Sequence, residues 1–124
     1  MYRLLGIARS EQSRMHAQTA RNYEFFGAPV GLIFAIDKQM PVGSWLDYGL
    51  FLQSIMISAR GRGLDSCPQA AFIDYADTVA EFVGLPQSEM VVCGMSLGYA
   101  DPDAVVNRLD TDRAPVSTFT VFHD

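Results

Sequence analysis

The stretch SWLDYGLFLQSIMISARGRG, residues 44–63, decides how the chain is organised. Ser44 and Asp47 match the S-x-x-D form of a capping box, and Arg60 followed by two glycines is typical of a helix end. The stretch therefore predicts a helix over residues 44–60, about 25 Å long at 1.5 Å per residue. Because this helix is apolar around most of its circumference, we expect it in the centre of a core or in a subunit interface.

Short apolar runs lie on either side of this helix. Residues 30–36 are almost wholly apolar, and residues 90–97 form a second run of the same kind. Both runs have the length and composition of buried strands, the first of them buried on both faces. Gly94 inside the second run indicates a bulge or a close backbone approach.

Two further helices complete the predicted alternation of helices and strands. The first covers residues 10–26 and is stopped by Gly27 and Pro29. The second follows a polar loop, GLDSCPQAAF, and places Ile73, Ala76, Ala80 and Val83 on one face before Gly84 and Pro86 end it. Only about three strands are visible, so the sequence predicts an α+β fold with a small sheet.

Length and composition place the chain among ordinary globular proteins. It has 124 residues, 49% of them apolar and 19% charged, which suits one domain. The formal charge of −5 argues against a nucleic-acid or anionic-membrane surface, because both require clustered basic residues. Two cysteines and an amino terminus interrupted by charges indicate reduced thiols and no signal peptide, so we expect a soluble cytoplasmic protein.

No local motif assigns a chemistry. His16 and His123 have no companion at metal-ligand spacing, and Cys67 and Cys93 are too far apart for a CxxC site, so no metal is expected. Patterns for a nucleophile elbow, a dinucleotide fold or a P-loop do not occur. The residues alone leave open a small-ligand-binding α+β domain.

Several ordered segments carry a resemblance to a known family. They are NYEFFGAPVGLIFAID, SWLDYGLFLQSIMISARGRGLDSCPQAAF, VVCGMSLGYADPDAVVNRL and DRAPV. In this order the segments resemble the latter part of flavin-dependent nitroreductases, so the chain looks like a C-terminal portion truncated at its N-terminus. The resemblance implies a nitroreductase-like α+β sandwich that forms an intertwined homodimer with FMN at the subunit interface. It also implies hydride transfer from NAD(P)H through FMN to a nitroaromatic or quinone acceptor.

The resemblance assigns one wall of the flavin site to the loop after the long helix. The matching positions are Pro68, Gln69, Ala70 and Ala71, where a backbone N–H just beyond the proline approaches N5 of the flavin. An amide donor at N5 stabilises the reduced or anionic flavin, so the backbone matters more there than the side chains. The flavin carries the hydride chemistry, which fits the absence of a catalytic acid and base.

A second cofactor-binding position is Arg113, which best matches the basic residue that the family places on the FMN phosphate. Its planar guanidinium can hold two phosphate oxygens. The competing interpretation is a solvated arm on which Arg113 pairs with Asp110 or Asp112. Arg108 is a weaker candidate for the phosphate.

The expected domain organisation is a single partial nitroreductase-like domain over residues 1–124, with a C-terminal arm from about residue 100 onward. The tail STFTVF, residues 117–122, is predicted to be an edge strand or to reach onto a partner subunit. The homodimer is expected to form through the helix over residues 44–60. Two functions stay open, an FMN-dependent oxidoreductase and an inactive remnant that acts only as a dimerisation or binding module.

Overall fold

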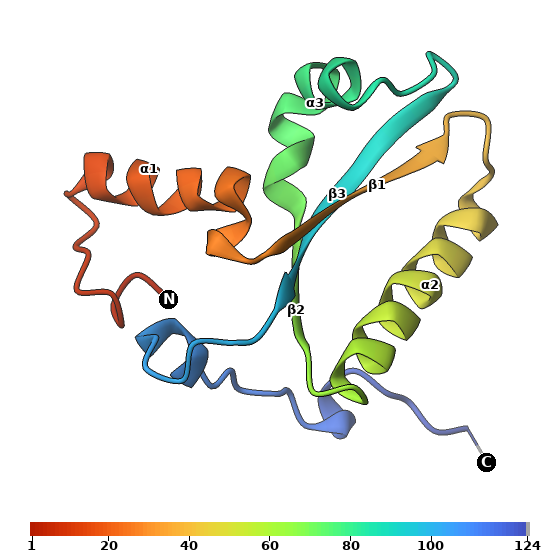
Figure 1. The fold of residues 1–124 in the computed structure, drawn as a ribbon. Helices are drawn as coiled ribbons and strands as arrows, with labels where there is room; N and C mark the ends of the chain where they lie inside the picture. Colours follow the sequence, from red (N-terminus) through yellow and green to blue (C-terminus); the bar gives the residue numbers. More distant parts are fainter. Residues whose placement is uncertain (124) are drawn as a thin grey trace.

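The computed structural model describes residues 1–123 and contains three α-helices, four 3₁₀ helices and three strands in this part of the chain (Figure 1). Their order is α1 (Gln12–Ala20), η1 (Arg21–Gly27), β1 (Val30–Asp37), α2 (Val42–Arg60), β2 (Asp65–Gln69), η2 (Ala70–Tyr75), α3 (Ala76–Val83), β3 (Glu89–Gly98), η3 (Val105–Arg108) and η4 (Val116–Thr118). This mixture confirms the α+β class.

The three strands form one antiparallel sheet in the order β1-β3-β2, so the last strand of the chain lies in the middle (Figure 1). β3 pairs with β1 from Val30–Leu97 to Asp37–Glu89, and with β2 from Asp65–Gly98 to Gln69–Gly94. The outer edges of β1 and β2 pair with no other strand among residues 1–123.

Different elements cover the two faces of the sheet. On one face Phe34, Cys93 and Met95 form a buried core cluster against the α2 side chains Tyr48, Leu52, Ile55 and Met56. Side chains alternate along a strand, so Gly94 faces the other side, where Phe72 of η2 covers it. The sheet therefore separates α2 from η2 and α3, as Figure 1 shows.

Both predicted apolar strands exist, but the burial expected for the first is wrong. Along β1 only Phe34 and Ile36 are buried, and Val30 and Gly31 are exposed. The three-stranded sheet is too small for its edge strand to be enclosed on both faces. The register shifts between Phe34 and Ala35, where β3 contributes an extra residue.

The long helix begins earlier than predicted. Pro41 is its N-cap, the Ser44 amide donates to the Pro41 carbonyl at 2.9 Å, and no side chain caps the first turn. Ser44 is thus the third helical residue, so the predicted capping box with Asp47 is wrong. The end at Arg60 and Gly61 is confirmed, with the Gly61 amide donating to the Ile57 carbonyl.

The first predicted helix is shorter than its apolar pattern indicated. α1 ends at Ala20, and the following turn is a 3₁₀ helix in which Phe25 and Phe26 adopt left-handed backbone angles with φ of 49° and 55°. Aromatic residues adopt this conformation only when tertiary contacts hold them there. The contacts of Phe25 with η2, described below, provide that support.

The polar loop expected over residues 63–72 is instead largely structured. Residues 65–69 form edge strand β2, which tolerates Pro68 because the proline needs no ladder hydrogen bond on its outer side. The helix expected afterwards begins as η2 and becomes α3 only at Ala76. It ends as predicted at Gly84, whose φ of 70° is left-handed.

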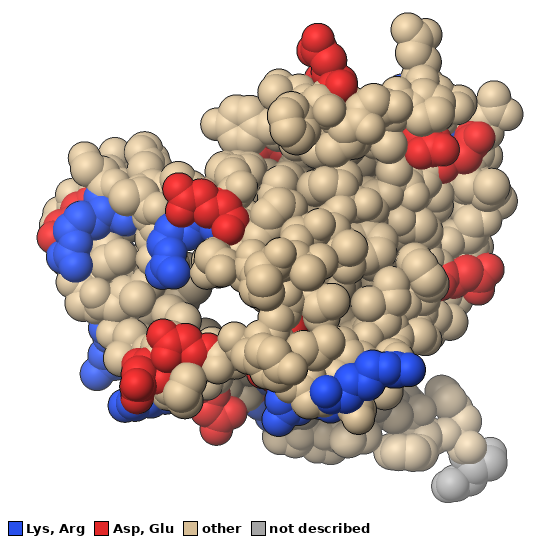
Figure 2. All heavy atoms as spheres, viewed as in Figure 1, with Lys and Arg blue, Asp and Glu red and all other residues tan. Residues whose placement is uncertain are grey.

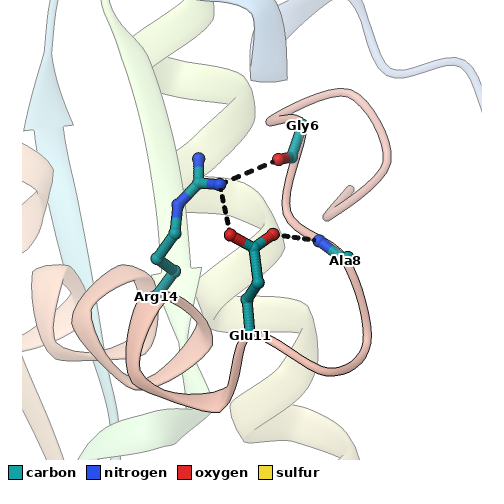
Figure 3. Close-up of polar contacts among 4 residues, drawn as sticks. All are labelled: Gly6, Ala8, Glu11 and Arg14. Carbon is teal, nitrogen blue, oxygen red and sulfur yellow. Dashed lines mark hydrogen bonds and ion pairs between the residues drawn. The ribbon is translucent and has the colours of Figure 1, made fainter.

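The N-terminal segment is tied to α1 through Glu11 (Figure 3). The Glu11 carboxylate accepts from the Ala8 amide at 2.7 Å and from the Arg14 guanidinium at 2.8 Å, and Arg14 also donates to the Gly6 carbonyl at 3.0 Å. The hydrogen bond from the Ala8 amide, and to a smaller extent the one from Arg14, lowers the pKa of Glu11 below its usual value of 4.5.

Beyond β3 the described chain runs as an extended arm with two short 3₁₀ turns. The Asp65 carboxylate accepts from the Ala100 amide at 3.0 Å and so anchors the start of this arm to β2. Residues 117–122 form no strand, so the predicted edge strand there is wrong, and Phe119 and Phe122 are exposed. Within residues 1–123 no helix has the length and apolar character needed to cross a membrane.

Candidate functional site

The predicted flavin-facing segment lies where β2 passes into η2. Pro68 and Ala70 are exposed and Ala71 is half-buried, whereas Gln69 between them is only 2% exposed. Since Gln69 and Ala70 are the last residue of β2 and the first of η2, this segment is a fixed corner of the sheet and not a free loop.

The Gln69 side chain points into the protein and has both ends of its amide paired. Its Nε2 donates to the Asn22 carbonyl at 2.8 Å, and its Oε1 accepts from the Ser96 hydroxyl at 2.9 Å. The Ser96 side chain is also buried. The Gln69 side chain is therefore not available to a ligand.

Tyr23 holds the other end of the segment. Its hydroxyl donates to the Ala71 carbonyl at 3.0 Å, across 48 positions of sequence. Desolvation, and after it the negative charge of Asp74, raises the pKa of Tyr23, so the hydroxyl keeps its proton. The sequence pattern had placed Tyr23 only on a helix face, and it carries no signal of this contact.

Two glycines let an aromatic pair lie directly on the sheet. The rings of Phe25 and Phe72 stack with centroids 4.9 Å apart and planes 27° apart. A Cβ at Gly31 would come within 2.4 Å of the Phe25 ring, and one at Gly94 within 2.4 Å of the Phe72 ring. The neighbour of Gly94 is thus an aromatic side chain and not a second stretch of backbone. Phe72 directly follows the site segment and fixes its far end.

The backbone amides of Ala70 and Ala71 are suited to a ligand acceptor. The first N–H groups of a helix have no partner within it. Gln69 precedes η2 but makes no side-chain cap, because its side chain is engaged by Asn22 and Ser96. Among residues 1–123 no side chain or turn carbonyl accepts from either amide.

Arg113 lies on the exposed arm, and the structure does not join it to the segment. Its guanidinium donates to the Thr111 carbonyl at 2.7 Å, to the Thr111 hydroxyl and to the Asp112 carbonyl at 3.3 Å. The ion pairs found in the described chain are Arg14–Glu11 and Arg60–Asp65, so Arg113 pairs with neither Asp110 nor Asp112. Arg108, on η3, is likewise exposed.

The outer face of α2 is apolar and open. Its exposed apolar side chains are Val42, Trp45, Leu46, Leu50, Phe51 and Ile57. Figure 2 shows few charged atoms over this side of the molecule, whereas charged side chains gather around the N-terminal segment. Tyr48 lies deeper, with its hydroxyl donating to the Ala35 carbonyl at 2.8 Å.

Within residues 1–123 the cysteines and acidic residues provide neither a metal-binding cluster nor an activated thiol. Desolvation raises the pKa of the thiols of Cys67 and Cys93, which disfavours reactive thiolates. No cluster of three His, Cys, Asp or Glu side chains suited to a metal exists in residues 1–123.

Together these features define a class of protein: a small α+β domain in which the segment Pro68–Ala71 is ordered at a corner of the sheet and the apolar outer face of α2 is exposed. The sequence profile of the Nitroreductase family matches residues 3–99, and this chain belongs to that family. The resemblance predicted from the ordered segments is thereby confirmed.

Two curated relatives illustrate the similarity. The 4-nitrobenzoate reductase of Pseudomonas putida is 54% identical over 101 residues, covering 82% of this chain and 44% of the relative. The chloronitrobenzene nitroreductase of Comamonas testosteroni is 42% identical over 117 residues, covering 94% and 52%. The chain thus spans about half the length of the curated relatives it matches.

Solved structures agree with this assignment. The FMN- and NADPH-dependent nitroreductase NfnB of Sphigopyxis sp. strain HMH superposes with a TM-score of 0.94 at 36% identity, over 99% of this chain and 55% of that one. The FMN-dependent NfnB of Mycobacterium smegmatis, solved with NADPH, gives a TM-score of 0.92 at 32% identity. The nitroreductase-like fold is therefore shown, over about half of the reference chains.

Proposed function

We propose that the chain contributes to an FMN-dependent oxidoreductase that passes hydride from NAD(P)H to a nitroaromatic or quinone acceptor. The observation that carries the proposal is the corner at Pro68–Ala71, where the Gln69 side chain is buried and the adjoining backbone amides are left without a side-chain cap. Relatives named for reduction of 4-nitrobenzoate and chloronitrobenzene favour nitroaromatics as the acceptor class.

The residues at this corner fit a flavin edge. FMN, when bound, supplies the hydride chemistry, and the protein supplies orientation and electrostatics. The amides of Ala70 and Ala71 would donate toward the flavin nitrogen N5, and a fixed donor there favours the reduced or anionic form. Pro68 is exposed beside them and presents an apolar ring without a donor.

Arg113 is proposed to bind the phosphate of FMN. In support, its guanidinium is exposed and forms no ion pair with a carboxylate in the described chain. Its present hydrogen bonds are to neutral acceptors on Thr111 and Asp112, which a phosphate would replace with stronger, charge-assisted bonds.

A homodimer through α2 is part of the same proposal. A single copy leaves Leu46 69% and Leu50 59% exposed, one helical turn apart on α2. A face of this kind is typical of a subunit interface. We further propose the cytoplasm, where NAD(P)H is available, as the location of the activity.

A flavin titration tests the proposed function. The purified protein is mixed with increasing FMN, and the absorption spectrum and flavin fluorescence are followed. NADH and NADPH consumption is then measured with and without a nitroaromatic acceptor. Saturable binding with acceptor-dependent consumption is expected. A stable, colourless dimer that leaves the FMN signal unchanged would instead identify a dimerisation module.

A further inference from the structure

The segment Asn22–Phe26 contacts the candidate flavin wall at two points and Phe72, the residue that follows the wall, at a third. The Asn22 carbonyl accepts from Gln69, the Tyr23 hydroxyl donates to the Ala71 carbonyl, and the Phe25 ring stacks on Phe72. These contacts bracket Ala70 from both sides. Such a set of contacts restricts the backbone of residues 69–72 more than any one of them would.

We infer that Tyr23 and Gln69 are positioning residues, which hold the Ala70 and Ala71 amides in the orientation that the flavin requires. The inference rests on the proposed function, since it specifies how the same site is kept in shape. Neither side chain is expected to touch the flavin: Gln69 is buried and paired at both ends, and the Tyr23 hydroxyl is bonded to a carbonyl.

The geometry explains why these side chains would control the amides. The Ala71 carbonyl shares its peptide plane with the Phe72 amide, and the hydrogen bond from Tyr23 fixes the orientation of this plane. The neighbouring peptide, which carries the Ala71 amide, is thereby restricted in its rotation. Gln69 precedes the Ala70 amide directly, and its side chain anchors it to β3 through Ser96 and to η1 through Asn22. A donor aimed at a ligand atom loses strength steeply when its angle changes.

The left-handed angles of Phe25 and Phe26 belong to the same arrangement. They turn the chain so that the Phe25 ring lies over Gly31 and against Phe72. A conformation of this kind costs on the order of one hydrogen bond or more and persists only where its surroundings impose it. The backbone strain therefore lies next to the candidate site, in the segment Asn22–Phe26 that positions the site.

Tyr23→Phe is the primary test, because it removes one hydroxyl and keeps the ring packed against Phe72 and Tyr75. Tyr75→Phe is the matched control: Tyr75 belongs to the same aromatic group, and its hydroxyl makes no hydrogen bond within residues 1–123. Ser96→Ala is a second variant that removes the donor to Gln69 at the opposite end of the wall.

The first measurement is the NMR order parameter of the Ala70, Ala71 and Phe72 amides without flavin, which reports how tightly the backbone orientation is held. In the wild type these values should lie at about 0.85, the rigid-backbone level, and Tyr23→Phe and Ser96→Ala should lower them toward about 0.6. Tyr75→Phe should match the wild type. Unchanged order parameters in both primary variants would overturn the inference, whether or not FMN binds.

The second measurement uses the flavin itself. Tyr23→Phe should weaken FMN binding by about three- to tenfold and make the bound flavin harder to reduce, while Tyr75→Phe should do neither. A wild-type chain that fails to bind FMN would refute the proposed function, and the order parameters would still decide whether the segment Asn22–Phe26 holds residues 69–72. Wild-type affinity and potential in Tyr23→Phe, with flavin bound, would refute the positioning role alone.

Discussion

The Phe72 ring lies so close to Gly94 that a Cβ on the glycine would come within 2.4 Å of ring carbon Cδ2. Gly94→Ala should therefore destabilise the protein by about 1–3 kcal/mol, the usual cost of overpacking a core. Urea unfolding followed by circular dichroism measures this. Gly43→Ala is the control, because no atom lies within 4 Å of the corresponding Cβ and alanine favours helix. A Gly94→Ala variant as stable as Gly43→Ala would contradict the packing described.

The proposed dimer is best tested at Leu46. Leu46→Asp places a charge in the centre of the exposed α2 face and should shift a micromolar sample from dimer to monomer, as measured by sedimentation. Phe51→Asp would also break the proposed interface, but its ring lies edge-on to Phe34 and Tyr48 with centroid distances of 6.3 and 5.9 Å, so the core would suffer as well.

Phe82→Asp is the control for the dimer test, since Phe82 on α3 is 91% exposed and lies outside α2. It should leave the assembly state unchanged. A wild-type protein that remains a folded monomer at micromolar concentration would rule out the dimer, and equal dissociation by both variants would rule out α2 as its interface.

Arg113→Ala should weaken FMN binding by about 1.5–3 kcal/mol if one charge-assisted hydrogen bond to the phosphate is lost. Riboflavin lacks the phosphate, so its affinity should hardly change. Arg108→Ala removes a comparable exposed guanidinium from the same arm and is the matched control. Equal weakening of FMN and riboflavin by Arg113→Ala would disprove the phosphate contact.

The N-terminal turn should loosen in acid. The pKa of Glu11 in the folded protein is lowered below 4.5. The contribution of its carboxylate to the stability of the N-terminal turn is therefore present above that value and is lost as the pH falls through the folded pKa. Exchange of the Ala8 amide, corrected for intrinsic rate, should rise in that range. Glu11→Gln should remove the pH dependence. A protection of Ala8 that does not change with pH would contradict the contact.

Much of the fold could be predicted because its signals are local. The apolar runs of β1 and β3 and the helix ends at Gly61 and Gly84 follow from neighbouring residues alone. The strand β2 could not be predicted, since its residues DSCPQ are polar and include a proline. They form a strand because β3, which is far along the chain, offers them a pairing edge.

The candidate site likewise combines a part that the sequence predicts with long-range contacts that it does not. The resemblance indicated the segment from Pro68 to Ala71, and that segment stays a proposal. The contacts that hold it cross 47 and 48 positions, from Gln69 to Asn22 and from Tyr23 to Ala71, so no periodicity reports them. The helical spacing of Tyr23 and Phe26 predicts that the helix continues. It does not continue, because the packing of Phe25 on Phe72 overrides local helix propensity there.

The two outer edges of the sheet differ in how they resist further pairing. Pro68 interrupts the free edge of β2, whereas β1, with the sequence VGLIFAID, has no proline and only one charged residue, at its end. An unpaired, apolar strand of this kind is a template for strand addition by another chain. Aggregation of the isolated chain should therefore start at β1. A lysine at an outward-facing position of that strand is the substitution expected to prevent aggregation at high protein concentration.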